Sequence, residues 1–208
     1  MQPQDVADFF TRSDGSYLFA RWGRPIVPVV FGVTDETLSV VKGAFEAVVT
    51  LADHKMAETD PELGANLMVF FCRDWAELPQ VPNLDRLVPE LDALCQRLAQ
   101  AGANQYRIFR FDPSGAISAV FVFLRMDENL AAVPAETLAL SQAVQSILLW
   151  SDHAFRDRSA LASLPDGTVI LPPDIAGLIR AAYDRTLPAM AQDAAHALRL
   201  YARLPKPV

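Results

Sequence analysis

The sequence predicts a single domain of α+β structure, with a small mixed β-sheet, one long packed helix and a C-terminal helical half. Three observations support this prediction. A short apolar strand near the N-terminus leads into an amphipathic helix, two strand-like runs flank an Asp-Pro-Ser-Gly turn, and the last third of the chain has mostly helical patterns. A length of 208 residues suits one domain.

The N-terminal elements begin with residues 1–24, a lead-in segment whose aromatic side chains can pack on a core. Residues 25–32 (PIVPVVFG) follow as a first strand, and their two prolines place part of it at a sheet edge because proline cannot donate to a ladder. A long helix is expected over 35–57, capped by Thr34 or Asp35. Its apolar stripe, which should face the sheet, contains Leu38, Val41, Phe45, Val48, Ala52 and Met56.

The middle of the chain completes the sheet-containing half, 25–124. Residues 65–72 (ANLMVFFC) are a strand expected in the same sheet as 25–32. A helical region over 83–101, bent at its internal proline, comes next. The runs 105–111 and 116–124 then form an antiparallel hairpin around a type I turn.

The helical half, 134–204, is predicted to contain helices over 136–150, 172–183 and 188–204. Between the first two lies an irregular stretch, 151–171. Loops of this length are uncommon unless they are functional or tied down, so this stretch is a candidate site region.

Composition narrows the classes of function. A net charge of −7 with dispersed basic residues argues against a nucleic-acid partner. The sequence contains no run of about 18 apolar residues, so no membrane span is predicted. The first residues do not resemble a signal peptide, so the chain as given indicates a cytoplasmic protein, or an exported or periplasmic one if a signal peptide was removed. Cys72 and Cys95 are too few for a disulfide framework and are interpreted as buried thiols.

Motifs for cofactors and metals are missing. No glycine-rich phosphate loop occurs, and the three histidines are too far apart in sequence for a local metal site, so no cofactor and no metal are expected. His153 differs from the other two because it follows Asp152 at the start of the irregular stretch. A structural and a functional role both remain open for this pair.

Several short motifs along the chain match, in the same order, the motifs of a known protein family. They are an Arg-Trp-x-x-Pro-Ile segment at the entry to the first strand, single matches on the C-terminal helices and at the start of the 151–171 stretch, and a final Tyr-Asp segment running to a Met. The matching residues are Arg21, Trp22, Pro25, Ile26, Gln145, Asp152, Asp174, Tyr183, Asp184, Leu187 and Met190. In these motifs the chain resembles a bacterial family of exported domains of unknown function with zincin-like, metzincin-related architecture. The resemblance spans most of the chain.

The departures from the family concern catalysis. The family has Glu-Glu-x-x-Gln on the helix matched by 136–150, whereas Ser141 and Gln142 stand at the two glutamate positions here. In the zincin pattern H-E-x-x-H these would be a zinc ligand and the general base, with Gln145 as the second ligand. A hydroxyl and two amides cannot supply that chemistry, so the resemblance implies the fold without zinc. Leu148 replaces the family's turn glycine, so the helix should continue to about Trp150.

The leading functional hypothesis is therefore a non-catalytic recognition or binding module of the bacterial cell envelope, whose partner is an unknown protein or envelope component. Gln145, Asp152 and His153 are its candidate binding residues, and Gln145 is expected to bond to backbone of the 151–171 stretch. One alternative is a hydrolase with an unidentified site near the same three residues. Another is a structural or assembly subunit whose apolar region around Trp150 and Phe155 is an interface rather than core. Convergent polar groups in a pocket would favour the enzyme, and a flat apolar patch would favour assembly.

Overall fold

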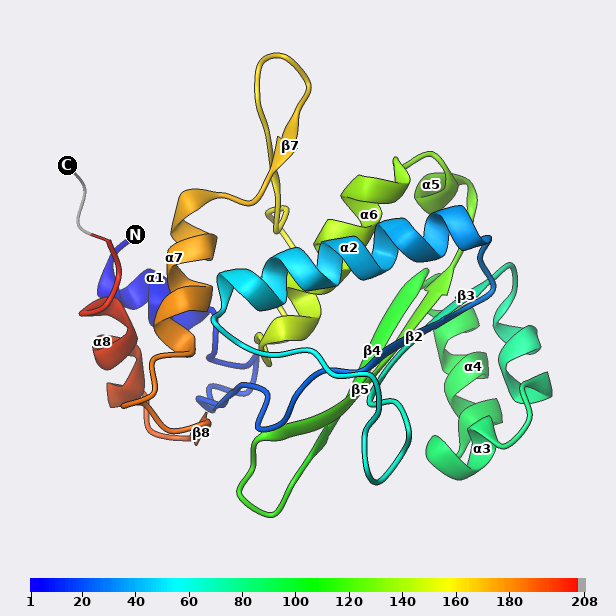
Figure 1. Ribbon diagram of the computed structural model, residues 1–208, viewed down its shortest axis with the longest axis horizontal. Helices are drawn as coiled ribbons and strands as arrows, with labels where there is room; N and C mark the ends of the chain where they lie inside the picture. The colour runs from blue at the N-terminus through cyan, green and yellow to red at the C-terminus, as the bar shows by residue number, and fades with distance from the viewer. Residues whose placement is uncertain (206–208) are drawn as a thin grey trace.

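A four-stranded mixed sheet forms the centre of the protein, whose computed structural model describes residues 1–205 (Figure 1). The strands lie in the order β2 (Pro28–Phe31), β3 (Leu67–Cys72), β5 (Ile117–Arg125) and β4 (Gln105–Phe111). The first two neighbouring pairs are parallel, and β4 runs antiparallel to β5. Both the placement of 65–72 beside 25–32 and the hairpin are confirmed, and β2 lies at an edge as its prolines predict.

Helices cover both faces of this sheet (Figure 1). On one face lie α2 (Asp35–Leu51) and α6 (Ala135–Ile147), and on the other lie η1 (Trp75–Gln80), α3 (Leu84–Leu87) and α4 (Leu91–Gln100). Successive side chains of a strand point to opposite faces of the sheet. In β3, Val69 packs into the core beneath α2 and α6, and its neighbour Phe70 packs into the core beneath α4. The chain is therefore an α+β protein, as predicted.

Helix α2 begins at the predicted cap, because the Thr34 side chain accepts a hydrogen bond from the Thr37 N–H. Val41, Phe45 and Val48 are each only 2% exposed and belong to the core, which confirms the predicted face. The predicted end at residue 57 is wrong. The helix stops at Leu51 because the following backbone turns away to hydrogen-bond near β2, where the Ile26 N–H donates to the Lys55 carbonyl at 2.9 Å.

The remaining elements pack at one end of the sheet or project from it (Figure 1). Helices α1 (Pro3–Asp8), α7 (Pro173–Ala182) and α8 (Ala195–Tyr201) lie together beside α2, and α5 (Glu128–Ala131) precedes α6. Strand β1 (Phe19–Ala20) pairs with β8 (Met190–Ala191), and β6 (Ala162–Ser163) pairs with β7 (Val169–Ile170) in a projecting hairpin. The aromatic side chains of the lead-in segment are buried, as expected from the sequence.

Three predicted helices end differently. The helix expected over 136–150 stops at Ile147, because Leu148 adopts an extended conformation and forms an isolated β-bridge with Arg21. The helix expected over 188–204 is only α8, since the residues before it pair with β1. The helical region 83–101 is divided into α3 and α4, with Glu90 in the left-handed region at the break.

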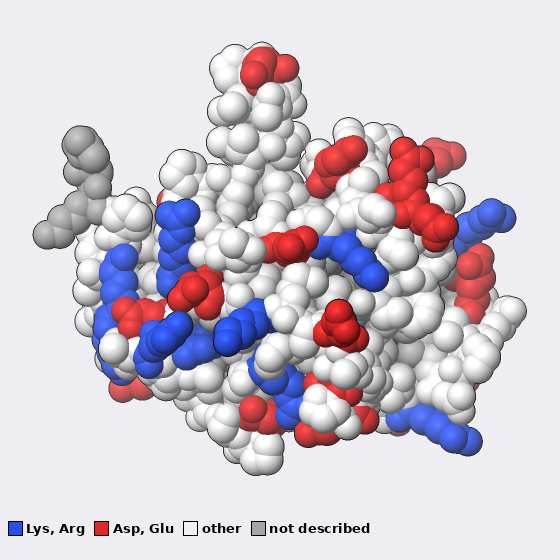
Figure 2. Space-filling model, viewed as in Figure 1, with Lys and Arg blue, Asp and Glu red and all other residues white. Residues whose placement is uncertain are grey.

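Surface charge is mixed on the face seen in Figure 2, where acidic and basic side chains are interspersed. Basic side chains are most frequent towards the end that carries α7 and α8. Throughout residues 1–205, no helix combines the length and apolarity needed to cross a bilayer. Cys72 and Cys95 are free, buried thiols, and burial raises the pKa of Cys72 to about 12.

Candidate functional site

An open groove of about 950 Å³ runs between β4 and the segment that follows α6. From the start of the β4 hairpin it is lined by Ala101, Ala103, Gln105, Tyr106, Arg107 and Phe109. From the end of α6 onward it is lined by Gln145, Trp150, Ser151, Asp152, Phe155 and Arg156. Two of the candidate binding residues, Gln145 and Asp152, thus line one groove, which we call the β4 groove.

The backbone of β4 is available in this groove because β4 is an edge strand. The Arg125 N–H donates to the Asn104 carbonyl, so Asn104 and every second residue after it bond to β5. The intervening residues, Gln105, Arg107 and Phe109, therefore direct their backbone groups away from β5. No second strand pairs with this edge within the part of the chain that the structure describes.

Arg107 joins β4 to α6 at the base of the groove. Its Nη2 donates to the side-chain oxygens of Gln105, at 3.0 Å, and of Gln142. Gln142 is 2% exposed, and its amide nitrogen donates to the same Gln105 oxygen at 3.3 Å. Burial lowers the pKa of Arg107 to about 10, which leaves the guanidinium charged at pH 7. Within residues 1–205, the side chains that bond this charged group are thus neutral.

Gln145 does not bond to the 151–171 stretch as expected. Its side-chain nitrogen donates instead to the Ser141 hydroxyl, one turn earlier on α6, at 2.9 Å. The chain after Leu148 is held by other groups: the Trp150 indole N–H donates to the Val144 carbonyl at 2.8 Å. Gln145 is therefore half-buried beside the groove and has no tie to the loop.

Asp152 is fixed by the lead-in segment. Its carboxylate accepts hydrogen bonds from the backbone N–H of Ser13, at 3.0 Å, and from the Ser13 hydroxyl. The backbone bond from Ser13 above all, with a smaller contribution from the His153 side chain, lowers the pKa of Asp152. His153 Nδ1 lies 3.4 Å from the same carboxylate, but His153 is not among the groove-lining residues. Asp152 and His153 are thus in contact, and of the two only Asp152 lines the groove.

The aromatic wall of the groove is part of the core. Trp150 is 8% exposed, stacks on Phe10 with centroids 5.5 Å apart, and meets Phe155 edge to face at 5.1 Å. A side chain packed on several sides cannot serve as a flat, exposed patch. The region around Trp150 thus gives no support to the assembly alternative.

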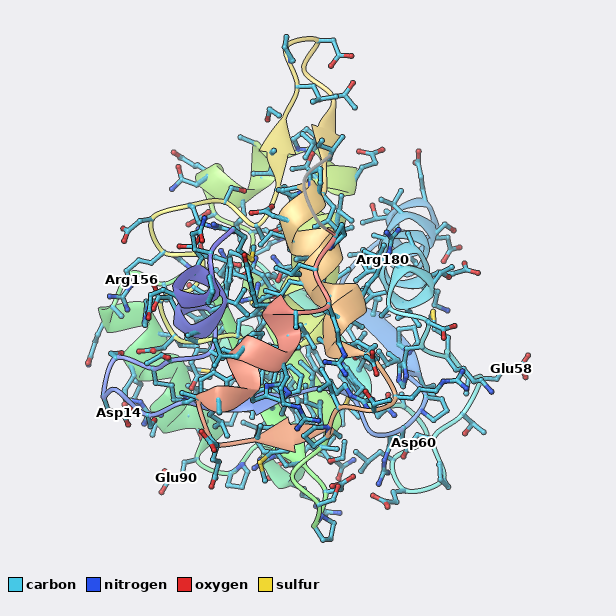
Figure 3. All side chains as sticks on the ribbon, turned by 90° about the vertical axis from the view of Figure 1, so that its left-hand side faces the viewer. Asp14, Glu58, Asp60, Glu90, Arg156 and Arg180 are labelled. Atoms are coloured by element: carbon cyan, nitrogen blue, oxygen red, sulfur yellow. The ribbon has the colours of Figure 1, made fainter. Side chains whose placement is uncertain are left out.

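Arg156 and Arg107 are the cationic side chains of the groove, and no motif in the sequence marks either as a site residue. Arg156 is exposed and lies on the same side of the molecule as Asp14, opposite Glu58 (Figure 3). No group of three or more His, Cys, Asp or Glu side chains suited to a metal ion occurs among residues 1–205. The alternation in QYRIFRF places Arg107 on one face of a strand, but only the fold shows that this face meets α6.

Fold and groove together define a class: an α+β protein with an open site along a free sheet edge. Comparisons with protein-family models, with curated proteins and with solved structures gave no match to this chain.

Proposed function

We propose that this chain is a non-catalytic recognition domain with zincin-like layering, which binds an extended peptide segment of a partner protein in the β4 groove. The partner class expected from the family resemblance is a protein of the bacterial cell envelope. The observation that carries the proposal is the free edge of β4, whose residues line an open groove of about 950 Å³. An unpaired strand edge offers N–H and C=O groups to an added strand.

The side chains on α6 support binding rather than hydrolysis. Ser141 and Gln145 bond to each other, and Gln142 bonds to Arg107 and Gln105. These three positions match the catalytic positions of a zincin peptidase in the resemblance, and they hold neutral groups engaged in hydrogen bonds. A general base must be free to accept a proton from water, and neither the Ser141 hydroxyl nor the two glutamine amides can do so.

A hydrolase remains the second candidate because polar groups do converge in the groove and a carboxylate–imidazole pair lies at its margin. In that reading Asp152 would orient His153, which would activate water. The lowered pKa of Asp152 suits an orienting carboxylate, since it stays ionised. Its two bonds from Ser13 favour the simpler role of anchoring the segment after α6.

The edge-binding proposal is tested with a matched pair of variants at the first residue of β4. Gln105→Pro removes an N–H that points to the free edge and leaves the bonds to β5 intact, whereas Gln105→Ala removes the same side chain but keeps that N–H. Peptides enriched from a random display library on the wild-type chain are then measured against both variants.

The expected result is weaker binding to Gln105→Pro than to Gln105→Ala, with backbone amide shifts in β4 when the peptides are added to the wild-type chain. Equal affinity for the two variants would show that the strand edge is not used. Enriched peptides that shift amides elsewhere, or no enrichment at all, would show that the β4 groove is not a peptide site.

A further inference from the structure

The guanidinium of Arg107 lacks an anionic partner. It forms no ion pair among residues 1–205, and the side chains that bond it, Gln105 and Gln142, are uncharged amides. Its Nε is enclosed and has no hydrogen-bond partner in this part of the chain. An arginine held away from water normally has a carboxylate or phosphate beside it, because an uncompensated charge is costly to bury.

The neighbouring amides orient this charge rather than neutralise it. Both glutamine oxygens accept from Nη2, and the Gln142 nitrogen donates to Gln105, so the two amides and the guanidinium form one closed set of bonds. Nη1 takes no part in these bonds and is not among the enclosed, unpartnered atoms. It therefore remains able to donate to a group in the groove that Arg107 lines.

The other charged groups of the groove give it a positive balance. Arg156 at the exposed margin forms no ion pair within residues 1–205. The one acidic side chain in the lining, Asp152, already accepts two bonds from Ser13 and lies 3.4 Å from His153. The groove therefore has two cationic side chains against one carboxylate, in a protein whose net charge is −7.

We infer that the β4 groove recognises a carboxylate on its peptide ligand, and that Arg107 is the residue that binds it. This inference rests on the proposed peptide-binding function and specifies its ligand as an acidic segment. A carboxylate can accept a charge-assisted hydrogen bond from Nη1, the one guanidinium nitrogen of Arg107 that is neither enclosed nor bonded to the two glutamines. Phe109 lies two residues after Arg107 on the same face of β4 and also lines the groove, so aromatic surface lies next to the anion site.

Gln142 supplies a direct test, because it already contacts Arg107 from a buried position on α6. Gln142→Glu would place a carboxylate of almost the same shape against the guanidinium and neutralise it from within. Arg107→Gln removes the charge itself. Arg110→Gln is the matched control, since Arg110 lies on the same strand, bonds to the Leu87 carbonyl and does not line the groove.

The experiment selects peptides from a random display library on the wild-type chain and on Gln142→Glu, in one library with free C-termini and one with blocked C-termini. Wild-type selections should enrich an Asp or Glu at one fixed position in the blocked library, or a free C-terminal carboxylate in the other. An enriched peptide should bind about tenfold more tightly than the same peptide with an amide in place of the selected carboxylate. This difference should hold for the wild-type chain and for Arg110→Gln. That preference should disappear in Gln142→Glu and Arg107→Gln.

The outcomes distinguish peptide binding along the β4 edge from carboxylate recognition by Arg107. Enriched peptides that shift β4 amides but show no preference for a carboxylate would overturn the role of Arg107 and leave edge binding in place. A carboxylate preference that persists in both Gln142→Glu and Arg107→Gln would show that another residue binds the carboxylate. Without enrichment on the wild-type chain, both proposals are wrong. Should Arg107→Gln fail to fold, the comparison of Gln142→Glu with the wild-type chain still decides.

Discussion

The Tyr17 hydroxyl and Nδ1 of His196 share a hydrogen bond of 2.9 Å, which joins α8 to the segment before β1. His196 is 4% exposed, and its ring lies against Phe19 with centroids 4.4 Å apart. Burial, with added repulsion from Arg199 and Arg203, lowers the pKa of His196 to about 4. The imidazole is therefore neutral in the folded protein at pH values where an exposed histidine is already charged.

This histidine should make the protein less stable in mildly acidic solution. Between the unfolded pKa of 6.5 and the folded pKa of about 4, the unfolded chain binds a proton that the folded chain excludes. The free energy of unfolding should therefore fall as the pH drops through this window, by about 1–2 kcal/mol after allowance for solvent screening. Urea unfolding measured at several pH values from neutral to acidic checks the prediction.

The control for this prediction is His196→Gln, which keeps a hydrogen-bonding group near Tyr17 and cannot titrate. Its stability should vary less with pH than that of the wild-type chain in the same window. Carboxylates with lowered pKa values, such as Asp60, lose their contribution only at lower pH and affect both proteins alike. Parallel pH curves for the two proteins would exclude His196 as the cause.

Removing the Ser146 hydroxyl should stabilise the protein. Ser146 is 1% exposed on α6, and its Oγ has no hydrogen-bond partner in residues 1–205. The substitution Ser146→Ala removes an unpaired polar group and introduces the best helix former, so the free energy of unfolding should rise by about 0.5–1.5 kcal/mol. Ser141→Ala is the matched control on the same helix, because Ser141 bonds to Gln145. A lower denaturation midpoint for Ser146→Ala would contradict the prediction.

The variant Gln145→Ala should separate stability from binding. The bond between Gln145 and Ser141 is half-buried, and water can replace it, so the free energy of unfolding should change by less than about 0.5 kcal/mol. Because Gln145 lines the β4 groove, peptide affinity should fall about three- to tenfold. Thermal melts and a binding titration measure the two quantities. A large fall in melting temperature with unchanged affinity would make Gln145 a structural residue.

Local patterns in the sequence were sufficient for the elements whose partners are close in the chain. The β4–β5 hairpin follows from its turn, and the buried face of α2 follows from helical spacing at Val41, Phe45 and Val48. The errors lie where a distant segment decides. Helix α6 ends before Leu148 because Leu148 pairs with Arg21. The residues on either side of Leu148 in the sequence give no sign of that distant contact.

The candidate site was only partly predictable for the same reason. The sequence singled out Gln145 and Asp152 by their motif positions, and both line the β4 groove. Arg107 has the pattern of an ordinary solvent-facing strand residue, since it alternates with apolar neighbours. Its importance depends on Gln142, which is distant in sequence and meets it only because α6 packs beside β4.

Gln142→Glu should stabilise the folded protein as well as alter its ligand preference. Arg107 is already charged, half-buried and bonded to neutral amides, so part of the desolvation cost of one ion is present before the change. A carboxylate at this buried position would form a charge-assisted pair with the guanidinium, and the free energy of unfolding at pH 7 should rise by about 1–2 kcal/mol.

The pH dependence identifies the source of this gain. The guanidinium should hold the pKa of the new carboxylate below the value of about 4.3 for an exposed glutamate. A carboxylate with a lowered folded pKa stabilises above its unfolded pKa, and that contribution is lost as the pH falls through the folded value. The difference in stability between Gln142→Glu and the wild-type chain should therefore be constant near neutral pH and vanish in acid. The same substitution combined with Arg107→Gln is the control, because without the cation a buried carboxylate should destabilise the protein. If Gln142→Glu alone lowered the denaturation midpoint at pH 7, Arg107 would not be an uncompensated charge, and the anion site inferred from it would have no basis.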